Sequence, residues 1–257
     1  MTALMPLFDA VRSQAILAFV IFLRVGAAMS LLPGFGEKMV PARIRLVLAF
    51  AFTAVVAPAV QPHVQALIES RPNSALVLLC ETMTGLSLGM VLRLFVLAIE
   101  MAGSLAAQSA SLSQMFGNSG EPAPAIGHVL LMAGLTLALL SGLHVRLAGA
   151  LILSYDALPV GQFPGAALMR DWGLAGISRA FALAFSLSAP FVIAALVYNL
   201  ALGVINRAMP SLMLSMIGAP ALTAGGLILL GVTAPLMLGV WNADFADFLA
   251  NPFAVPR

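Results

Sequence analysis

The sequence predicts an all-α integral membrane protein with about six long apolar helices, and two observations lead to this fold class. Of the 257 residues, 61% are hydrophobic and only 9% are charged, whereas soluble domains average about 25% charged residues. The 12 basic and 10 acidic side chains are too few to cover the surface of a soluble chain of this size. Most of the surface therefore faces lipid or other apolar protein.

The second observation is a series of six apolar runs, each long enough to cross roughly 30 Å of hydrocarbon at a rise of 1.5 Å per residue. They cover residues 15–32, 44–60, 76–98, 129–153, 177–202 and 221–240. No gap between them can hold a soluble domain, so residues 1–257 are expected to form a single membrane-embedded domain. Pro41 is placed to begin the second helix, and Pro58 with Pro62 to end it. The third run continues in helical register through Gln108, which predicts a helix longer than one crossing.

Composition argues against several classes of function. The net charge is +2 and the basic residues are scattered singly, so nucleic-acid binding is not expected. The single cysteine, Cys80, allows neither an internal disulfide nor a thiolate zinc site. His128 and His144 lie 16 residues apart, which places them about 160° apart around one helix, and they cannot share a metal. We therefore expect no metal, no cofactor and no enzymatic activity.

One motif has a catalytic and a structural interpretation. Gly85, Ser87 and Gly89 spell the nucleophile elbow of serine hydrolases, which requires a strand-to-helix turn. Here the motif lies inside an apolar helical run. The favoured interpretation is that Gly85 and Gly89 form a G-x-x-x-G face where another helix approaches closely.

Ionisable side chains inside apolar runs indicate function, because each costs at least about 2 to 3 kcal/mol at the bilayer centre unless it is paired or hydrated. The candidates are Arg24, Glu81, Arg93, Glu100, Arg146 and Arg179. Arg93 and Glu100 lie seven residues apart, so they mark one polar stripe on a helix. Such a stripe suits a proton relay or a buried contact with another subunit. Assembly is favoured, because no other run offers a matching set of carboxylates.

The segment at residues 113–125 is the most unusual loop. A Met115-Phe116 pair is followed by the structure breakers Gly117, Gly120 and Pro122. The pattern predicts a flexible flap, with an ordinary surface loop as the alternative.

Residues 241–257 are expected to form an amphipathic C-terminal tail. Trp241, Phe245, Phe248 and Leu249 follow helical spacing, and Asp244 and Asp247 should face away from them. The aromatic side chains suit a membrane-interface belt, and a docking helix for a partner is the alternative.

An ordered series of residues over most of the chain resembles the FliR/SctT family, the R-type export-gate subunit of bacterial flagellar and injectisome type III secretion systems. The series comprises Arg24, the Pro33 loop, Pro41 with Arg43 and Arg45, Glu81, Gly85, Ala102-Gly103, Gln108, Gly142 with His144, Ser154, Leu158-Pro159, Gly161, Gly203, Asn206-Arg207 and Pro210. The chain departs from the family pattern at Ser109-Ala110, Ser211 and Met213.

The resemblance implies a gating subunit of the bacterial inner membrane, in the flagellar basal body. It would join P-type and Q-type gate subunits in a spiral of helical hairpins, with the B-type switch subunit and other basal-body components as further partners. This assembly would form the entry pore for unfolded secreted proteins. The segment after Gln108 would act as a plug in the closed pore, formed by Gln114, Met115, Phe116, Gly117, Asn118, Ser119 and Gly120.

Buried assembly contacts are expected at the intramembrane charges and small residues, together with positions from the resemblance. They are Arg24, Glu81, Gly85, Gly89, Arg93, Glu100, Gly103, Gln108, His144, Asn206 and Arg207. The alternative function is a stand-alone secondary transporter or proton-coupled carrier. Such a protein would show an internal repeat, and none is evident between residues 1–125 and 126–257.

Overall fold

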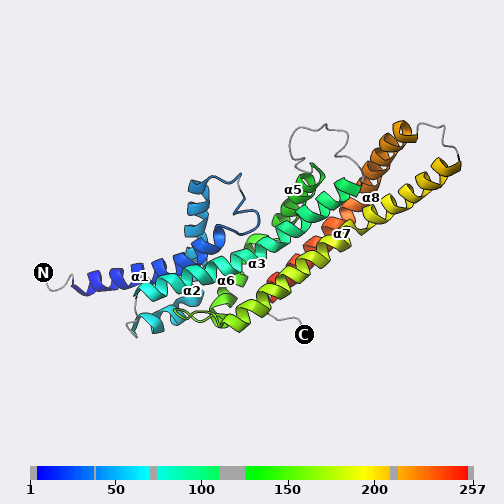
Figure 1. Ribbon diagram of the computed structural model, residues 1–257. Helices are drawn as coiled ribbons and strands as arrows, with labels where there is room; N and C mark the ends of the chain where they lie inside the picture. The colour runs from blue at the N-terminus through cyan, green and yellow to red at the C-terminus, as the bar shows by residue number, and fades with distance from the viewer. Residues whose placement is uncertain (1–4, 38, 70–73, 110–124, 209–213, 254–257) are drawn as a thin grey trace. The chain divides into compact units, whose positions relative to one another are not determined.

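The computed structural model describes residues 5–37, 39–69, 74–109, 125–208 and 214–253, and within these ranges the chain is entirely helical and irregular, without strands. The predicted all-α class is confirmed. The described helices are α1 (Met5–Met29), α2 (Ala42–Glu69), α3 (Ser74–Ser109), α5 (Ala125–Leu140), α6 (Leu143–Ala157), α7 (Ala166–Ala208) and α8 (Leu214–Ala250) (Figure 1).

The chain forms two compact units, and each unit combines segments that are distant in sequence. The first comprises Met1–Leu94, Gly142–Ile177 and Ala246–Arg257; the second comprises Phe95–Ser141 and Ser178–Phe245. The long helices α3, α7 and α8 therefore contribute residues to both units. The single membrane-embedded domain expected over residues 1–257 stays a prediction.

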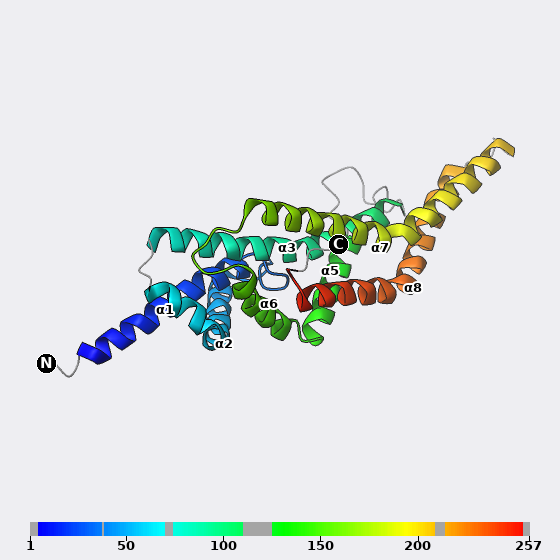
Figure 2. The same cartoon turned by 90° about the horizontal axis from the view of Figure 1, so that it is seen from below.

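In the first unit, α1 packs against α2 and α3, and α6 lies beside α2 (Figure 2). The side chains of Ile21, Val25 and Met29 are fully buried along α1. Phe22 of α1 stacks on Phe50 of α2 with ring centroids 4.6 Å apart. Aromatic and aliphatic packing therefore joins α1 to α2.

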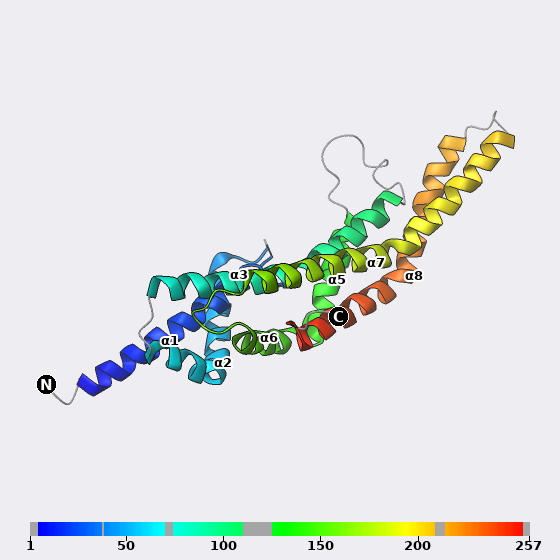
Figure 3. The same cartoon turned by 60° about the horizontal axis from the view of Figure 1, so that its bottom comes forward.

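In the second unit, α7 and α8 run beside each other (Figures 1 and 3), and α8 also packs on the second half of α3. Trp241 is fully buried, and its Nε1 donates to the carbonyl oxygen of Phe95 at 2.8 Å. Phe245 packs on the Phe95 ring with centroids 4.9 Å apart. The aromatic residues that predicted an amphipathic tail thus lie inside the chain, and residues 241–250 form the end of α8.

The apolar run at 129–153 is two helices, not one. α5 ends at Leu140 and α6 begins at Leu143, with Gly142 in the left-handed conformation at φ +83°. Residues that have a Cβ rarely adopt this backbone conformation. Five described helices are long and apolar enough to span a membrane, and the number becomes six if α5 and α6 form one broken span.

The expected end of the second helix was wrong. α2 continues to Glu69 and contains both Pro58 and Pro62. Each proline removes one backbone hydrogen bond, but apolar helices tolerate this when neighbouring groups satisfy the freed carbonyls. The helix begins at Ala42, and the carbonyl of Pro41 accepts the N–H of Arg45 at 3.1 Å. The expected continuation of the third helix is confirmed, since α3 extends unbroken to Ser109.

Candidate functional site

The most highly connected polar group in the first unit is a buried ion pair between Arg24 of α1 and Glu81 of α3. Both side chains are 0% exposed. The Nε of Arg24 donates to Oε2 of Glu81 at 2.7 Å, and Nη2 donates to Oε1 at 3.1 Å. This two-point geometry is the strongest arrangement of an arginine on a carboxylate.

The remaining donors of Arg24 bind the end of α6. Nη1 donates to the carbonyl oxygen of Ser154 at 3.0 Å and to its Oγ at 3.3 Å, and Nη2 donates to the carbonyl oxygen of Leu158 at 3.0 Å. All five N–H groups of the guanidinium are therefore used. The ring of Tyr155 lies 4.0 Å from the guanidinium carbon and adds a cation–π contact.

Glu81 receives a third donor, the backbone N–H of Gly161, at 2.9 Å from Oε1. Gly161 has φ +73°, and a Cβ there would lie 2.9 Å from Leu67. A larger residue would strain the turn that presents this N–H. The site thus joins α1, α3, the last turn of α6 and the segment after it through a single pair of charges.

A regular seam on α3 extends from this pair. Glu81, Gly85, Gly89 and Arg93 are spaced by four residues and share one side of the helix. A Cβ on Gly85 would collide with the carbonyl oxygen of Arg24, and one on Gly89 would lie 2.8 Å from that of Ala28. The predicted G-x-x-x-G face is therefore a close contact between α3 and α1.

The same motif has no hydrolase geometry. Ser87 lies in the middle of α3, and its hydroxyl donates to the carbonyl oxygen of Met83 at 2.7 Å. The nucleophile elbow requires a turn between a strand and a helix.

At the far end of the seam, Arg93 binds the loop after α1. Its Nη1 donates to Oε1 of Glu37 at 2.6 Å. Arg45 binds the same loop through carbonyl oxygens, with Nε donating to Phe35 at 3.2 Å and Nη2 to Glu37 at 3.1 Å and Val40 at 3.3 Å. Helical spacing placed Arg93 and Glu100 on one polar stripe without predicting a pair, and the partner of Arg93 is Glu37. Glu100 is half-buried, and within the described ranges it forms no ion pair.

The second unit contains its own arginine–carboxylate pair. Nε of Arg179 donates to both carboxylate oxygens of Asp244 at 3.1 Å, and Nη2 donates to Oδ1 at 2.7 Å and to the backbone carbonyl at 3.0 Å. The guanidinium carbon lies 5.6 Å from the centre of the Phe95 ring. Asp244 therefore joins α8 to α7, although helical spacing had placed it facing away from the packed face.

The other predicted positions have varied environments. Gly103 is buried and meets the backbone of Gly127, so a Cβ there would collide with α5. Gln108, His144, Arg146 and Arg207 are exposed. Asn206 lies in the last turns of α7. Gln114 to Gly120 lie outside the described residues. The role of all these positions in assembly stays a prediction.

Several residues of the buried site were absent from the candidate assembly contacts. Ser154, Leu158 and Gly161 appeared only within the family-like series, and Tyr155, Glu37 and Asp244 had no signal as partners. Backbone donors and acceptors, and single carboxylates that pair with a distant segment, leave no periodic pattern in a sequence. Among the described residues, no group of three or more His, Cys, Asp or Glu side chains could hold a metal ion.

Comparison with known proteins gives consistent matches over most of the chain. Residues 15–248 match the family described as bacterial export proteins, family 1. The flagellar biosynthetic protein FliR of Caulobacter vibrioides is 31% identical over 244 residues, covering 92% of this chain and 95% of that protein. FliR of Aquifex aeolicus is 29% identical with 88% of each chain covered. FliR of Escherichia coli is 27% identical, with 84% of this chain and 83% of that protein covered.

Replacing Glu81 with Gln should destabilise the first unit strongly. The variant leaves the Arg24 charge buried without its counter-charge, a change that costs about 3 to 5 kcal/mol. The measurement is thermal unfolding of the full chain in detergent. Glu100→Gln is the matched control, because it removes the same charge from the same helix at a position outside the ion pair. Equal melting temperatures for the two variants would contradict the importance of the pair.

Proposed function

The chain belongs to family 1 of the bacterial export proteins, and from this premise we propose that it is a structural and gating subunit of the flagellar type III export gate. In this role it forms part of the pore through which unfolded flagellar proteins enter the secretion channel. The match over residues 15–248 and the FliR relatives support the export function and membership of a larger apparatus. The proposal adds the pore, the gating role and the partners.

The observation that best supports assembly is the length of the apolar helices. The apolar span of α7 covers 40 residues, Ala166–Ile205, and that of α3 covers 36. At 1.5 Å per residue the α7 span is about 60 Å long, against about 30 Å of hydrocarbon. Even a helix tilted by about 40° would rise about 46 Å. Lipid alone cannot cover such a helix, so other protein must.

Little of this apolar length is covered within the chain itself. In an apolar stretch of 18 residues taken from each helix, only 11% of the α8 stretch and 39% of the α7 stretch is buried. Large side chains such as Val192, Leu196 and Leu200 of α7 are exposed, as are Ile228 and Val232 of α8. Lipid covers such side chains only over about 30 Å of hydrocarbon, so the part of a face that extends beyond this thickness is open to other protein. We assign these faces to the P-type and Q-type gate subunits, in the inner membrane at the flagellar basal body. The B-type switch subunit is assigned as a further partner.

Replacing Leu196 and Leu200 together with Gln should prevent assembly. These side chains are 68% and 69% exposed and lie one turn apart on α7, so their replacement changes an outer face and not the core. Recovery of the complex co-expressed with P-type and Q-type subunits should fall at least about tenfold, which corresponds to about 1.4 kcal/mol. Leu140→Gln, an exposed leucine at the end of α5, is the control and should assemble normally.

A different result would favour the carrier alternative. If the double variant assembled fully, and the isolated chain formed a monodisperse species that transported a solute, the gate proposal would be wrong.

The plug is proposed from the sequence of Gln114 to Gly120. A peptide-wide pore at rest would dissipate the membrane potential, so apolar side chains must exclude water from its lumen. Met115 and Phe116 offer such a seal, and the following glycines suit a segment that a substrate can displace. Replacing residues 114–120 with an equally long Gly/Ser segment should raise ion conductance in cells that contain the assembled complex. Unchanged conductance in a verified complex would show that the segment is a connection only.

A further inference from the structure

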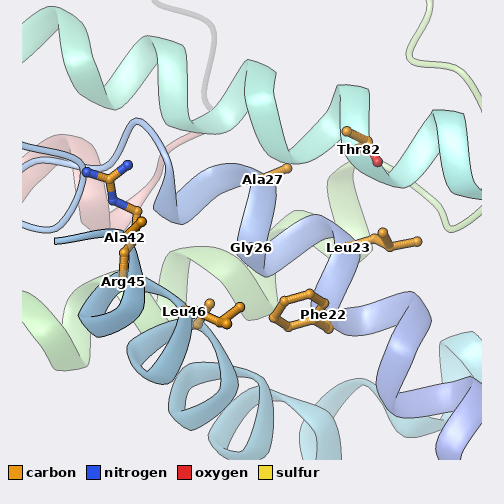
Figure 4. A pocket seen from close by; sticks show the side chains of 9 residues that line it. Phe22, Leu23, Gly26, Ala27, Ala42, Arg45, Leu46 and Thr82 are labelled. Atoms are coloured by element: carbon orange, nitrogen blue, oxygen red, sulfur yellow. The ribbon is translucent and has the colours of Figure 1, made fainter.

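An open groove lies between the first three helices of the first unit. Its volume is about 320 Å³, within the range of sites that hold small organic ligands. It is lined by Phe22, Leu23, Gly26 and Ala27 of α1, by Ala42, Arg45, Leu46 and Ala49 of α2, and by Thr82 of α3. Figure 4 shows the Phe22 ring and Leu46 between α1 and α2, with Arg45 at one end and Thr82 on the far helix.

The body of the groove is apolar. Two lining side chains are polar, and the hydroxyl of one of them, Thr82, donates to the carbonyl oxygen of Leu78 in its own helix at 2.8 Å. A polar ligand would find no further side-chain partner along the α1 wall. The groove therefore suits a flexible hydrocarbon chain.

One end of the groove is positively charged. Arg45 directs Nε and Nη2 to three backbone carbonyls, and its Nη1 forms no hydrogen bond with a described residue. The nearby carboxylate of Glu37 is taken by Arg93 at 2.6 Å. Arg45 therefore has hydrogen-bond acceptors but no opposite charge among the described residues.

The N-terminus of α2 adds positive charge at the same end. A helix N-terminus has partial positive charge, where anions are stabilised, and the first turn of α2 contains no acidic residue. Arg43 is exposed in this turn, but it does not line the groove and lies about 160° from Arg45 around the helix. Arg45 and the helix N-terminus therefore leave an uncompensated positive field beside the apolar groove.

We propose that the groove binds an anionic phospholipid, with one acyl chain between α1 and α2 and the phosphate at Arg45 and the N-terminus of α2. A molecule that joins a hydrocarbon chain to an anion matches both features, and basic pockets between membrane helices bind such headgroups. The inference rests on the membrane location in the proposed function. One lipid molecule would then be bound at a defined position in the first unit, in addition to the bilayer lipid that surrounds the helices.

The test measures lipid binding by native mass spectrometry on the detergent-purified full chain and on its co-expressed complex. Each is titrated with dioleoyl phosphatidylglycerol, dioleoyl phosphatidylcholine or glycerol 3-phosphate. We expect the protein to retain phosphatidylglycerol at a lower added lipid concentration than it needs to retain phosphatidylcholine. Glycerol 3-phosphate should not be retained.

Two variants with matched controls identify the site. Gly26→Leu fills the groove, and its Cβ makes only ordinary contact with Phe22 at 3.5 Å; it should abolish the preferential binding. Gly149→Leu adds the same side chain at a position with open space and should bind normally. Arg45→Gln should weaken phosphatidylglycerol binding about fivefold, which corresponds to about 1 kcal/mol, whereas Arg43→Gln, which removes the same charge from the same turn outside the groove lining, should not.

Each contrary outcome overturns the inference in its own way. Equal retention of the two lipids would show that Arg45 does not select an anionic headgroup, and unchanged binding by Gly26→Leu would show that the lipid lies outside the groove. Binding of glycerol 3-phosphate alone would indicate a free phosphate site. Lipid bound by the isolated chain but not by the complex would make the groove a protein interface. Failure of the complex to form would count against the proposed function instead, because the isolated chain is still measured.

Discussion

A single buried guanidinium sets the constraint on which the first unit depends. An arginine in an apolar interior must find an opposite charge and acceptors for five N–H groups, because water is not available to it. Arg24 meets that requirement only where α1, α3 and the end of α6 come together at Glu81, Ser154 and Leu158. Apolar packing alone would allow these helices to slide or rotate, whereas the hydrogen bonds accept only one register.

The glycine seam follows from the same pair. Glu81 can reach Arg24 only if α3 lies close to α1, and Gly85 and Gly89 allow that approach over the next two turns. Arg24 contacts Glu81, Ala28 contacts Gly89, and Glu37 in the loop after α1 contacts Arg93, so residue numbers increase together along the two helices. The two helices therefore run in the same direction. α2, which lies between them in sequence, runs back to the start of α3.

Sequence reasoning was most successful where one helix determines the outcome. Composition and run length predicted the all-α apolar class, and register predicted the long third helix and the Gly85–Gly89 contact. It was less successful where distant segments meet. Spacing placed Arg93 and Glu100 on one stripe but gave no partner for Arg93, which binds Glu37, 56 residues away in sequence. No periodicity reports such a partner. The outward direction assigned to Asp244 failed for the same reason, since only tertiary contact places Arg179 beside it.

Two features of the chain exceed what a stable bundle of membrane helices needs, and these indicate its function. Helices longer than the bilayer and faces left uncovered are costly for an isolated protein and useful for a subunit of a larger assembly. The internal ion pairs hold each unit in shape so that these faces are presented in a fixed arrangement. The function proposed above uses these faces as helical walls of an export pore.

A double-mutant cycle on Arg24→Met and Glu81→Met tests the central claim most directly. The free energy of unfolding of the full chain would be measured in detergent for both single variants and the double variant. If the pair is the main constraint, each single change leaves a buried, unmatched partner, and the double variant loses less than the sum, with a coupling energy of about 2 kcal/mol or more. Losses that simply add would show that Arg24 and Glu81 act independently, and would contradict the account.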